Sequence, residues 1–514
     1  MRNSILVALF LALGSCRSTS VDPSAASSQR AQARPNVVVV FVDDLGVGEL
    51  GCYGQERIRT PHIDSISANG VRFTNAYTGS PVCAPARCVL LTGRHSGHAV
   101  VRANWENGGW GPDEPEGQWP LPASEETLAE RLHALGYRTG GFGKWGLGGP
   151  GTEGAPERQG FDHFYGYLCQ RVAHNYYPTH LWRDGVREPI PGNAYFPAHQ
   201  TLDAPLSSAG AYGERFGRGR EGYAPARIAD DMIEWLEDAA SADEPFFLYY
   251  ASIIPHLALQ VPADVSGRYP SSWDEEPYLG DRGYLPHPSP RRAYAGMISF
   301  LDDQVGRILG VLEANGALDD TVVLFTSDNG ASYVGGVDTA FFGSHDGRRG
   351  HKGQLWEGGI RVPFIAQWPG RFPAGATSDH LVSSLDVTAT LLDLIGAAPA
   401  AGLDSESFAS VLANGTSARP RSPLYWEYRP FGGQAVRDGR WKLVRTGLKK
   451  GEPKLHLFDL DDDPAESRNV AEENPDVVAR LEAFMDRSHV PSVAFPLPTV
   501  DDPASGSAAR TSTP

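Results

Sequence analysis

Carboxylate and amide side chains follow two of the most apolar runs in the sequence. Asp43 and Asp44 come directly after residues 36–42, which read NVVVVFV, and Asp328 and Asn329 come directly after a second run, VVLFTS. Such runs are typical of buried strands in α/β sheets, and ligands of these sheets bind beyond the carboxyl ends of the strands. Oxygen donors suit a hard cation such as Ca²⁺ or Mg²⁺ and disfavour zinc or copper. The four residues are therefore candidate metal ligands, although either pair alone would more often form a turn or a helix cap.

A third segment with residue types suited to chemistry is 83–87, which reads CAPAR. It fits C-x-P-x-R, the pattern that sulfatase-maturing enzymes read when they convert a cysteine to formylglycine. Alone, the pattern would more often mark a buried cysteine at the start of a loop. Here the run continues to Arg94 as CVLLTGR, and the whole stretch closely resembles the signature of type I, formylglycine-dependent sulfatases of the arylsulfatase A-like group. Four further segments match that family in the same order.

One of these segments is 136–148, which carries GYRT and GKWGLG and resembles the family string G-Y-x-T…G-K-W-H-L-G. Lys144 matches the lysine that contacts the sulfate. The chain departs from the family at Gly146, where the family has a histidine that helps release enzyme-bound sulfate. That role has no obvious holder in this sequence.

Another segment is 348–363, which contains RRGHKG and EGGIRVP and resembles the family string R-G-x-K…E-G-G-I-R-V-P. Lys352 matches the second sulfate-binding lysine, and we expect Glu357 and Arg361 to brace it. His256 follows the apolar run FFLYYA and matches a family histidine that faces the leaving-group oxygen, although a single loop histidine is usually a surface or packing residue.

The resemblance implies a complete hydrolytic site. Formylglycine made from Cys83, once hydrated, would attack the sulfur, Arg87 would orient the hydrate, and His256 would protonate the departing oxygen. Lys144, Lys352 and, if charged, His256 would stabilise the negative charge that develops on the sulfate oxygens. The metal, calcium or alternatively magnesium, would lower the pKa of the hydrate. Its implied ligands are Asp43, Asp44, Asp328, Asn329 and the modified Cys83.

Two histidines outside this set are candidates for substrate binding. His174 lies in an aromatic stretch that begins at Gly160 and ends at Pro178, and such a cluster suits stacking on sugar rings. A buried aromatic loop explains the stretch equally well. His345 precedes the Lys352 segment and could line the same pocket. His174 is also our candidate for the role left open at Gly146.

The elements that must position these residues alternate along the chain. Apolar runs at 36–42, 246–251, 321–326 and 362–367 predict strands, and helical spacing lies between them, with Ser124 expected to cap the helix that carries Leu128. Alternation of this kind predicts an α/β fold with a large, mainly parallel sheet between helices. The resemblance implies the alkaline phosphatase-like version of that fold. Short strand-like pieces from about Arg421, followed by a helix near 477–484, predict a smaller α+β domain.

The ends of the chain differ from the rest. A basic residue, an apolar run and Leu13-Gly14-Ser15-Cys16 form an export signal that resembles a bacterial lipobox, which would make Cys16 a lipidated membrane anchor. An ordinary secretory signal is the alternative. We therefore expect a signal peptide, a flexible linker, a catalytic domain, a small C-terminal domain and a disordered tail, at residues 1–16, 17–34, 35–420, 421–495 and 496–514. The other four cysteines are too few for a disulfide scaffold.

Composition limits the partners of the protein. The chain has 514 residues, 41% hydrophobic and 21% charged, with a net charge of −17, which argues against nucleic acid as a partner. Any anionic substrate must be held by local cations.

Together these features predict an exported sulfuric ester hydrolase of the cell envelope or periplasm that depends on a maturation enzyme. We expect a sulfated carbohydrate as substrate. The alternatives are a phosphoesterase or phosphonate hydrolase of the same superfamily, or a non-catalytic lipoprotein that binds sulfated glycans.

Overall fold

Strand β1 (Asn36–Val42) lies at the centre of a ten-stranded sheet in the computed structural model of the chain. The structure describes residues 34–501, apart from 109–115, 195–201, 209–219, 274–275 and 416–419. The expected signal peptide with Cys16, nearly all of the linker, and the tail beyond residue 501 lie outside the described residues. None of the described helices is both long and apolar enough to cross a membrane.

Four central strands of this sheet run parallel. β9 (Thr321–Ser327) and β8 (Phe246–Ala251) flank β1, and β4 (Arg138–Lys144) pairs with the far side of β8. The register places Val38 beside Leu248 on one side and Val323 on the other. The carboxyl ends of all four strands therefore lie at one edge of the sheet, as the sequence predicts.

The outer strands make the sheet mixed. The full order is β11-β2-β10-β9-β1-β8-β4-β5-β6-β7, and β10, β6 and β7 pair antiparallel to their neighbours. A small separate sheet joins β3 and β12. The bounds of these strands are β2 Val71–Phe73, β3 Ala76–Tyr77, β5 His163–Tyr167, β6 His180–Arg183, β7 Val186–Pro189, β10 Phe364–Gln367, β11 Ala376–Ser378 and β12 Val382–Ser383.

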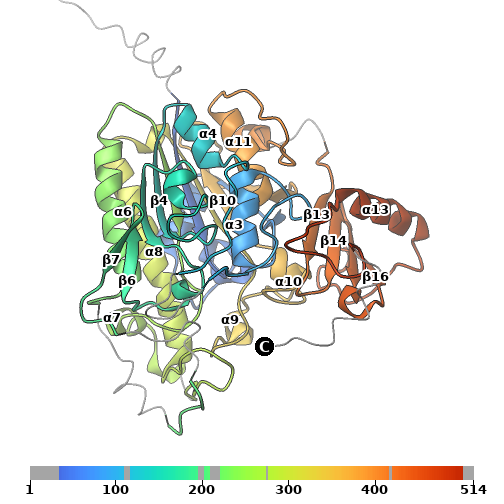
Figure 1. Cartoon of the computed structure of the whole chain (residues 1–514), viewed down its shortest axis with the longest axis horizontal. Helices are drawn as coiled ribbons and strands as arrows, with labels where there is room; N and C mark the ends of the chain where they lie inside the picture. Colours follow the sequence, from blue (N-terminus) through green and yellow to red (C-terminus); the bar gives the residue numbers. More distant parts are fainter. Residues whose placement is uncertain are drawn as a thin grey trace, which may run out of the picture. The chain divides into compact units, whose positions relative to one another are not determined.

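Successive residues of β1 point into two different cores. Val37, Val39 and Phe41 pack with residues of α3, α4 and α11, whereas Val38 and Val40 pack with residues of α2, α6 and α8. Helices therefore cover both faces of the sheet (Figure 1), and the unbroken apolar run reflects burial on both sides. The bounds of the helices are α2 Pro61–Ala68, α3 Cys83–Thr92, α4 Leu128–Ala134, α6 Ala224–Ala240, α7 Ala263–Ser266, α8 Pro290–Ala314, α9 Thr339–Phe342, α10 Glu357–Ile360, α11 Val387–Leu394, α12 Ala409–Asn414 and α13 Pro475–Ser488.

The start of α4 differs from the sequence expectation. The cap is Thr127, not Ser124, because the Thr127 hydroxyl accepts a hydrogen bond from the Glu130 amide while the Glu130 carboxylate accepts one from the Thr127 amide. This reciprocal capping box satisfies two amides that a helix end leaves free. The spacing of Thr127 and Glu130 was visible in the sequence, and the helix is one turn shorter than expected.

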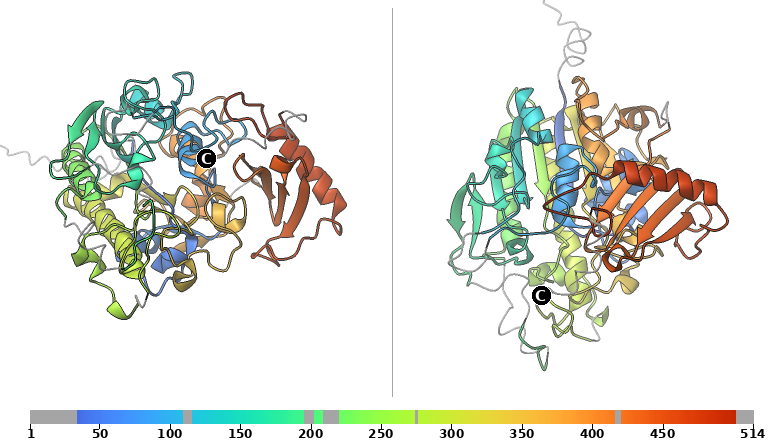
Figure 2. Two further views of the ribbon diagram at one scale, coloured as in Figure 1. Left: turned by 60° about the horizontal axis from the view of Figure 1, so that its bottom comes forward. Right: turned by 45° about the vertical axis from the view of Figure 1, so that its right-hand side comes forward.

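The C-terminal region forms its own antiparallel sheet of four strands, with α13 packed against β14 and β15 (Figure 2). The strands are β13 Leu424–Tyr428, β14 Gly433–Asp438, β15 Trp441–Thr446 and β16 Lys454–Asp459. The expected α+β architecture is therefore present. The sequence analysis missed β16. Its sequence, KLHLFD, alternates polar and apolar residues only in its first four positions, and His456 within it is half-buried.

Buried ion pairs join the four-stranded C-terminal sheet to the segment that follows Lys352. Lys442 of β15 lies fully buried with its Nζ 2.9 Å from Glu357 and 2.8 Å from Glu466. Arg361 lies 3.2 Å from the other oxygen of Glu357. We call Glu357, Arg361, Lys442 and Glu466 the brace. In the brace, buried charges of opposite sign hold α10 against β15.

Candidate active site

Strand ends bring the candidate residues together at one edge of the parallel sheet. Asp43 follows β1, Asp328 follows β9, Lys144 ends β4, and His256 lies in the loop after β8. Because these four strands are neighbours, side chains far apart in the sequence meet in one buried group. Together with Asp44, Cys83, Arg87, Asn329 and Lys352 they form what we call the reaction cluster.

The acidic residues of the reaction cluster hold one another through short contacts. The Asp44 amide donates to Asp328 Oδ1 at 3.1 Å, and Asn329 Nδ2 donates to Asp44 Oδ1 at 2.7 Å. Asp44 adopts a φ of +66°, a left-handed conformation that is uncommon for residues other than glycine. In this conformation the Asp44 amide meets Asp328 while the Asp44 carboxylate meets Asn329.

The chemistry of this group fits a bound cation. Asn329 Oδ1 is buried without a hydrogen-bond partner among the described residues. Burial and the neighbouring Asp43 carboxylate raise the pKa of Asp328 to about 8. Three carboxylates and an orphan amide oxygen in one buried place are the donors that a hard cation takes. Asp43, Asp44, Asp328 and Asn329 could therefore hold the metal expected from the sequence.

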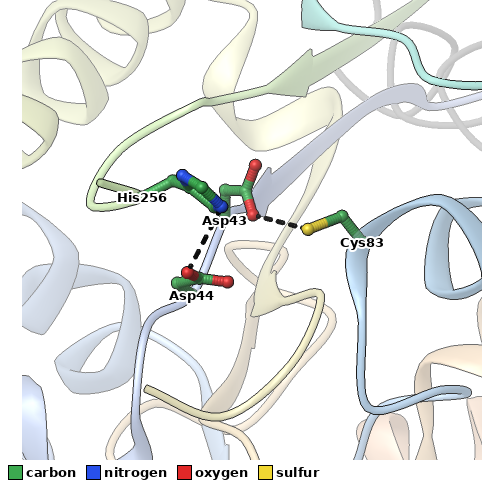
Figure 3. Close-up of side chains that lie close together, drawn as sticks. All are labelled: Asp43, Asp44, Cys83 and His256. Atoms are coloured by element: carbon green, nitrogen blue, oxygen red, sulfur yellow. Dashed lines mark hydrogen bonds and ion pairs between the residues drawn. The ribbon is translucent and has the colours of Figure 1, made fainter. Parts of the chain in front are cut away.

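Cys83 is the first residue of α3, and its side chain points at the same acidic group (Figure 3). Its Sγ donates a hydrogen bond to Asp43 Oδ1 at 3.2 Å. Burial, reinforced by Asp43, raises the pKa of the thiol to about 12. Because the thiolate is the reactive form of cysteine, an unmodified Cys83 is a poor nucleophile at neutral pH.

Three cations, the buried Arg87 and Lys144 and the partly buried Lys352, each meet a different carboxylate around Cys83. Lys144 Nζ lies 2.6 Å from Asp43, and Lys352 Nζ lies 2.7 Å from Asp44. Arg87 lies 3.1 Å from Asp328 and also donates to the Lys144 carbonyl at 2.9 Å. The structure thus brings all three predicted cations into the reaction cluster.

His256 faces this group with one ring nitrogen. Nδ1 lies 2.6 Å from the Leu257 carbonyl and donates to it, and Nε2 lies 3.6 Å from Asp44 (Figure 3). Burial and the nearby Lys352 lower the pKa of His256 to about 4. A pKa this low favours the neutral imidazole near pH 7.

His174 lies directly on His256, which the sequence could not show. The two rings are stacked with centroids 4.1 Å apart and an angle of 12° between their planes. Tyr284 meets both imidazoles edge-on, at 5.9 Å from His174 and 6.0 Å from His256. Tyr284 is a site residue that sequence reasoning missed, because nothing in its local sequence marks it.

The remaining candidate residues make other contacts. His345 lies near His351, the residue before Lys352, and its Nδ1 is buried without a hydrogen-bond partner among the described residues. Glu357 and Arg361 belong to the brace, and within the described chain neither makes a hydrogen bond to Lys352. They support Lys352 only through the backbone between them.

Most of the aromatic stretch near His174 is core rather than binding surface. Phe164, Tyr165 and Tyr167 belong to β5, and these side chains, with Phe161 and Tyr176, are all at least 96% buried. For these residues the structure agrees with the alternative that the stretch is a buried aromatic segment and not a surface for stacking on sugar. Only His174 from this stretch stacks on a residue of the reaction cluster.

Gly146 borders the reaction cluster in a left-handed conformation, with a φ of +78°. A Cβ placed there would lie 3.6 Å from the Gln170 side chain and 3.9 Å from Arg87 Cδ. Gln170 is buried, and its Oε1 has no hydrogen-bond partner among the described residues. The side chain beside Gly146 is therefore Gln170, a residue that the sequence analysis did not single out.

Comparisons with known proteins agree with this geometry. The sulfatase family matches residues 35–397, and the family described as N-sulphoglucosamine sulphohydrolase, C-terminal, matches residues 348–489. Human arylsulfatase A is 34% identical over 496 residues, covering 87% of this chain and 86% of the relative. N-acetylgalactosamine-6-sulfatase of the dog is 30% identical over 372 residues, covering 71% of this chain and 63% of the relative.

A solved structure has a similar fold. Ps i-CgsB, crystallised in complex with k-i-k-neocarrahexaose, aligns with a TM-score of 0.69 and 25% sequence identity. The alignment covers 88% of this chain and 93% of that one.

Proposed function

This chain belongs to the sulfatase family and hydrolyses sulfate esters, and from that premise we propose that its substrate is a sulfated carbohydrate. One relative is named N-acetylgalactosamine-6-sulfatase, and Ps i-CgsB was crystallised with k-i-k-neocarrahexaose. The observation that carries the proposal is the convergence of Arg87, Lys144 and Lys352 on the buried carboxylates around Cys83.

The nucleophile in this proposal is made from Cys83. Formylglycine at this position supplies, once hydrated, a hydroxyl that can attack sulfur. The thiol itself is poorly suited, because burial raises its pKa to about 12. Cys83 begins α3, so its side chain is fixed in direction by the helix, and Asp43 lies within reach to accept a hydrogen bond from it.

The cations bind and orient the sulfate group. Lys144 and Lys352 lie far apart in the sequence. Asp43 holds Lys144 in place, and Asp44 holds Lys352. Arg87 is oriented by Asp328 and by the Lys144 carbonyl. Charges fixed before the reaction stabilise the negative charge that develops on the sulfate oxygens without a cost for reorganisation.

A hard cation, which we propose to be Ca²⁺, would be held by Asp43, Asp44, Asp328 and Asn329 and would supply further positive charge to the sulfate and the nucleophile. The orphan Oδ1 of Asn329 and the raised pKa of Asp328 support this assignment.

His256 is suited to protonate the departing sugar oxygen. Its Nδ1 donates to the Leu257 carbonyl, so Nε2, which faces Asp44, is the ring nitrogen that can take up a proton and pass it to the departing oxygen. Burial and Lys352 lower the pKa of the imidazole to about 4, so the neutral ring must first take up a proton at Nε2, and it then gives that proton readily to a leaving alkoxide.

We also propose that the chain is exported and anchored by a lipid on Cys16, on the basis of the sequence before residue 17. Metabolic labelling with palmitate should mark the wild type and fail to mark Cys16→Ser. Secretion of an unlabelled wild-type chain would identify an ordinary signal peptide instead.

The test of substrate class is a desulfation screen with protein produced beside a formylglycine-generating enzyme. Sulfated mono- and disaccharides, an aryl sulfate and the matching aryl phosphate are compared by kcat/KM. We expect the sulfated saccharides to be the best substrates. A higher kcat/KM for the phosphate would instead identify a phosphoesterase.

A further inference from the structure

A cavity near the reaction cluster has no role in the chemistry described above. Its volume is about 750 Å³, within the range of pockets that bind small ligands. The described residues that line it come from two stretches, 273–291 and 333–340. Among them are Trp273, Tyr278, Asp281, Arg282, Tyr333 and Asp338.

Two contacts place this cavity next to the site of sulfate transfer. Tyr333 stacks on His351 with ring centroids 3.5 Å apart, and His351 directly precedes Lys352. On the other side, a Cβ built on Gly335 would lie 2.6 Å from Leu257 and 3.1 Å from Tyr284. The loop that carries Tyr333 therefore packs against the residues beside His256.

The ring of Tyr333 presents a rigid aromatic surface to solvent. Its side chain is 50% exposed, while the stack on His351 fixes one of its faces. Tyr278 is held in a different way, by a hydrogen bond from its hydroxyl to the Gly283 carbonyl and another from the Arg282 amide at 2.9 Å. Gly336, with a φ of +90°, lets the loop approach the Tyr278 ring closely.

The charges of the cavity favour an uncharged ligand rich in hydroxyl groups. Arg291 is paired with Asp338 through two hydrogen bonds of 2.9 and 2.8 Å, so neither charge is available to a ligand at full strength. The other charged side chains in the lining are Glu276, Asp281 and Arg282. A sulfate or carboxylate in this cavity would meet two carboxylates and one guanidinium, whereas hydroxyl groups can bond to either kind.

We infer that this cavity is a subsite for an uncharged sugar ring next to the sulfated residue, with Tyr333 as the surface on which that ring stacks. The inference rests on the proposed function, because it assumes a carbohydrate substrate. It adds a preference for an uncharged sugar next to the sulfated one, which the reaction cluster alone does not impose.

The experiment compares matched substrates on the mature, metal-loaded protein. The panel holds 4- and 6-sulfates of galactose and N-acetylgalactosamine as monosaccharides, as disaccharides with an unsulfated galactose neighbour, and as disaccharides with a glucuronate neighbour. We expect kcat/KM to be higher for the galactose-extended substrate than for the monosaccharide. In Tyr333→Ala this gain should fall by about tenfold, the factor that corresponds to 1.4 kcal/mol.

Two variants serve as controls. Tyr333→Phe keeps the ring and should keep the gain. Val186→Ala changes an exposed residue of β7 outside the cavity and should behave as the wild type.

The inference is overturned if the extended substrate brings no gain, if the gain survives Tyr333→Ala, or if glucuronate brings the larger gain. Hydrolysis of the aryl sulfate without hydrolysis of any sugar sulfate would instead overturn the proposed substrate class, and the subsite with it.

Discussion

Buried charges gather in the reaction cluster and in the brace, and the two groups follow different rules. In the brace, Lys442 lies between Glu357 and Glu466. Burial opposes the ionisation of Glu357, but Lys442, Arg361 and Arg437 together outweigh it and lower the pKa of Glu357 to about 2, while burial and Glu357 raise the pKa of Glu466. In the reaction cluster, burial and Asp43 raise the pKa of Asp328 to about 8.

The difference shows how a working site can be told from a structural one. The brace separates its two carboxylates with a lysine, so its charges stabilise the join between α10 and β15. The reaction cluster crowds three carboxylates so closely that, despite three cations, burial and Asp43 still raise the pKa of Asp328, and it leaves Asn329 Oδ1 without a partner among the described residues. Such an arrangement is unfavourable until a cation and an anionic substrate enter, which is typical of functional sites.

The largest effect is expected at Cys83. Cys83→Ala should lower kcat on the order of 10⁴-fold or more, because it removes the precursor of the nucleophile. Mass spectrometry of the wild type should show an aldehyde or its hydrate at residue 83. Cys88→Ala, which changes another buried cysteine of α3, is the matched control and should retain turnover. A fully active protein with an unmodified thiol at position 83 would contradict the proposed mechanism.

The second effect concerns Asp328. Asp328→Asn should lower kcat by about 10³-fold, because it removes a charged ligand from the cation site. Added Ca²⁺ should stabilise the wild type and not the variant. A requirement for zinc, or equal stabilisation of both proteins by Ca²⁺, would show that the ligand set is wrong.

The third effect tests the brace. Glu357→Gln should lower the free energy of unfolding by about 3–5 kcal/mol, because it leaves Lys442 buried beside one carboxylate instead of two. Glu473→Gln breaks an ion pair with Arg468 that is more than half exposed, and we expect a loss below about 1 kcal/mol. Urea unfolding of both variants measures the difference. Similar losses would mean that the brace is not a distinct structural element.

The smallest effect is a dependence of stability on pH at His489. Burial opposes the charge on this imidazole, but Glu427 and Asp501 outweigh it and raise its pKa above 6.5. The stabilisation is therefore complete below pH 6.5 and is lost as the pH rises through the raised pKa.

His489→Gln should accordingly destabilise the protein by about 1 kcal/mol more at pH 6 than at pH 9. Thermal midpoints at the two pH values provide the measurement. His133→Gln, at a side chain that is 56% exposed, is the control and should show no such difference. A destabilisation by His489→Gln that grows with pH would contradict a raised pKa of His489.

Local patterns in the sequence determined much of this protein. The apolar run before Asp43 predicted a strand buried on both faces, because a β-branched run without alternation has no solvent side. The carboxylates after β1 and β9 could be assigned to one edge because parallel strands end on the same side. Cys83, Lys144 and Lys352 were found because each lies within a short segment whose letters resemble a family string.

Only the tertiary structure decided which other side chains reach the site. His174 stacks on His256 from 82 positions away, and Tyr284 and Gln170 have no local pattern that marks them. The same holds for the brace, where Lys442 finds Glu357 at a separation of 85 residues. Periodicity and propensity report on neighbours within a turn or a strand pair, whereas these contacts depend on how whole elements pack.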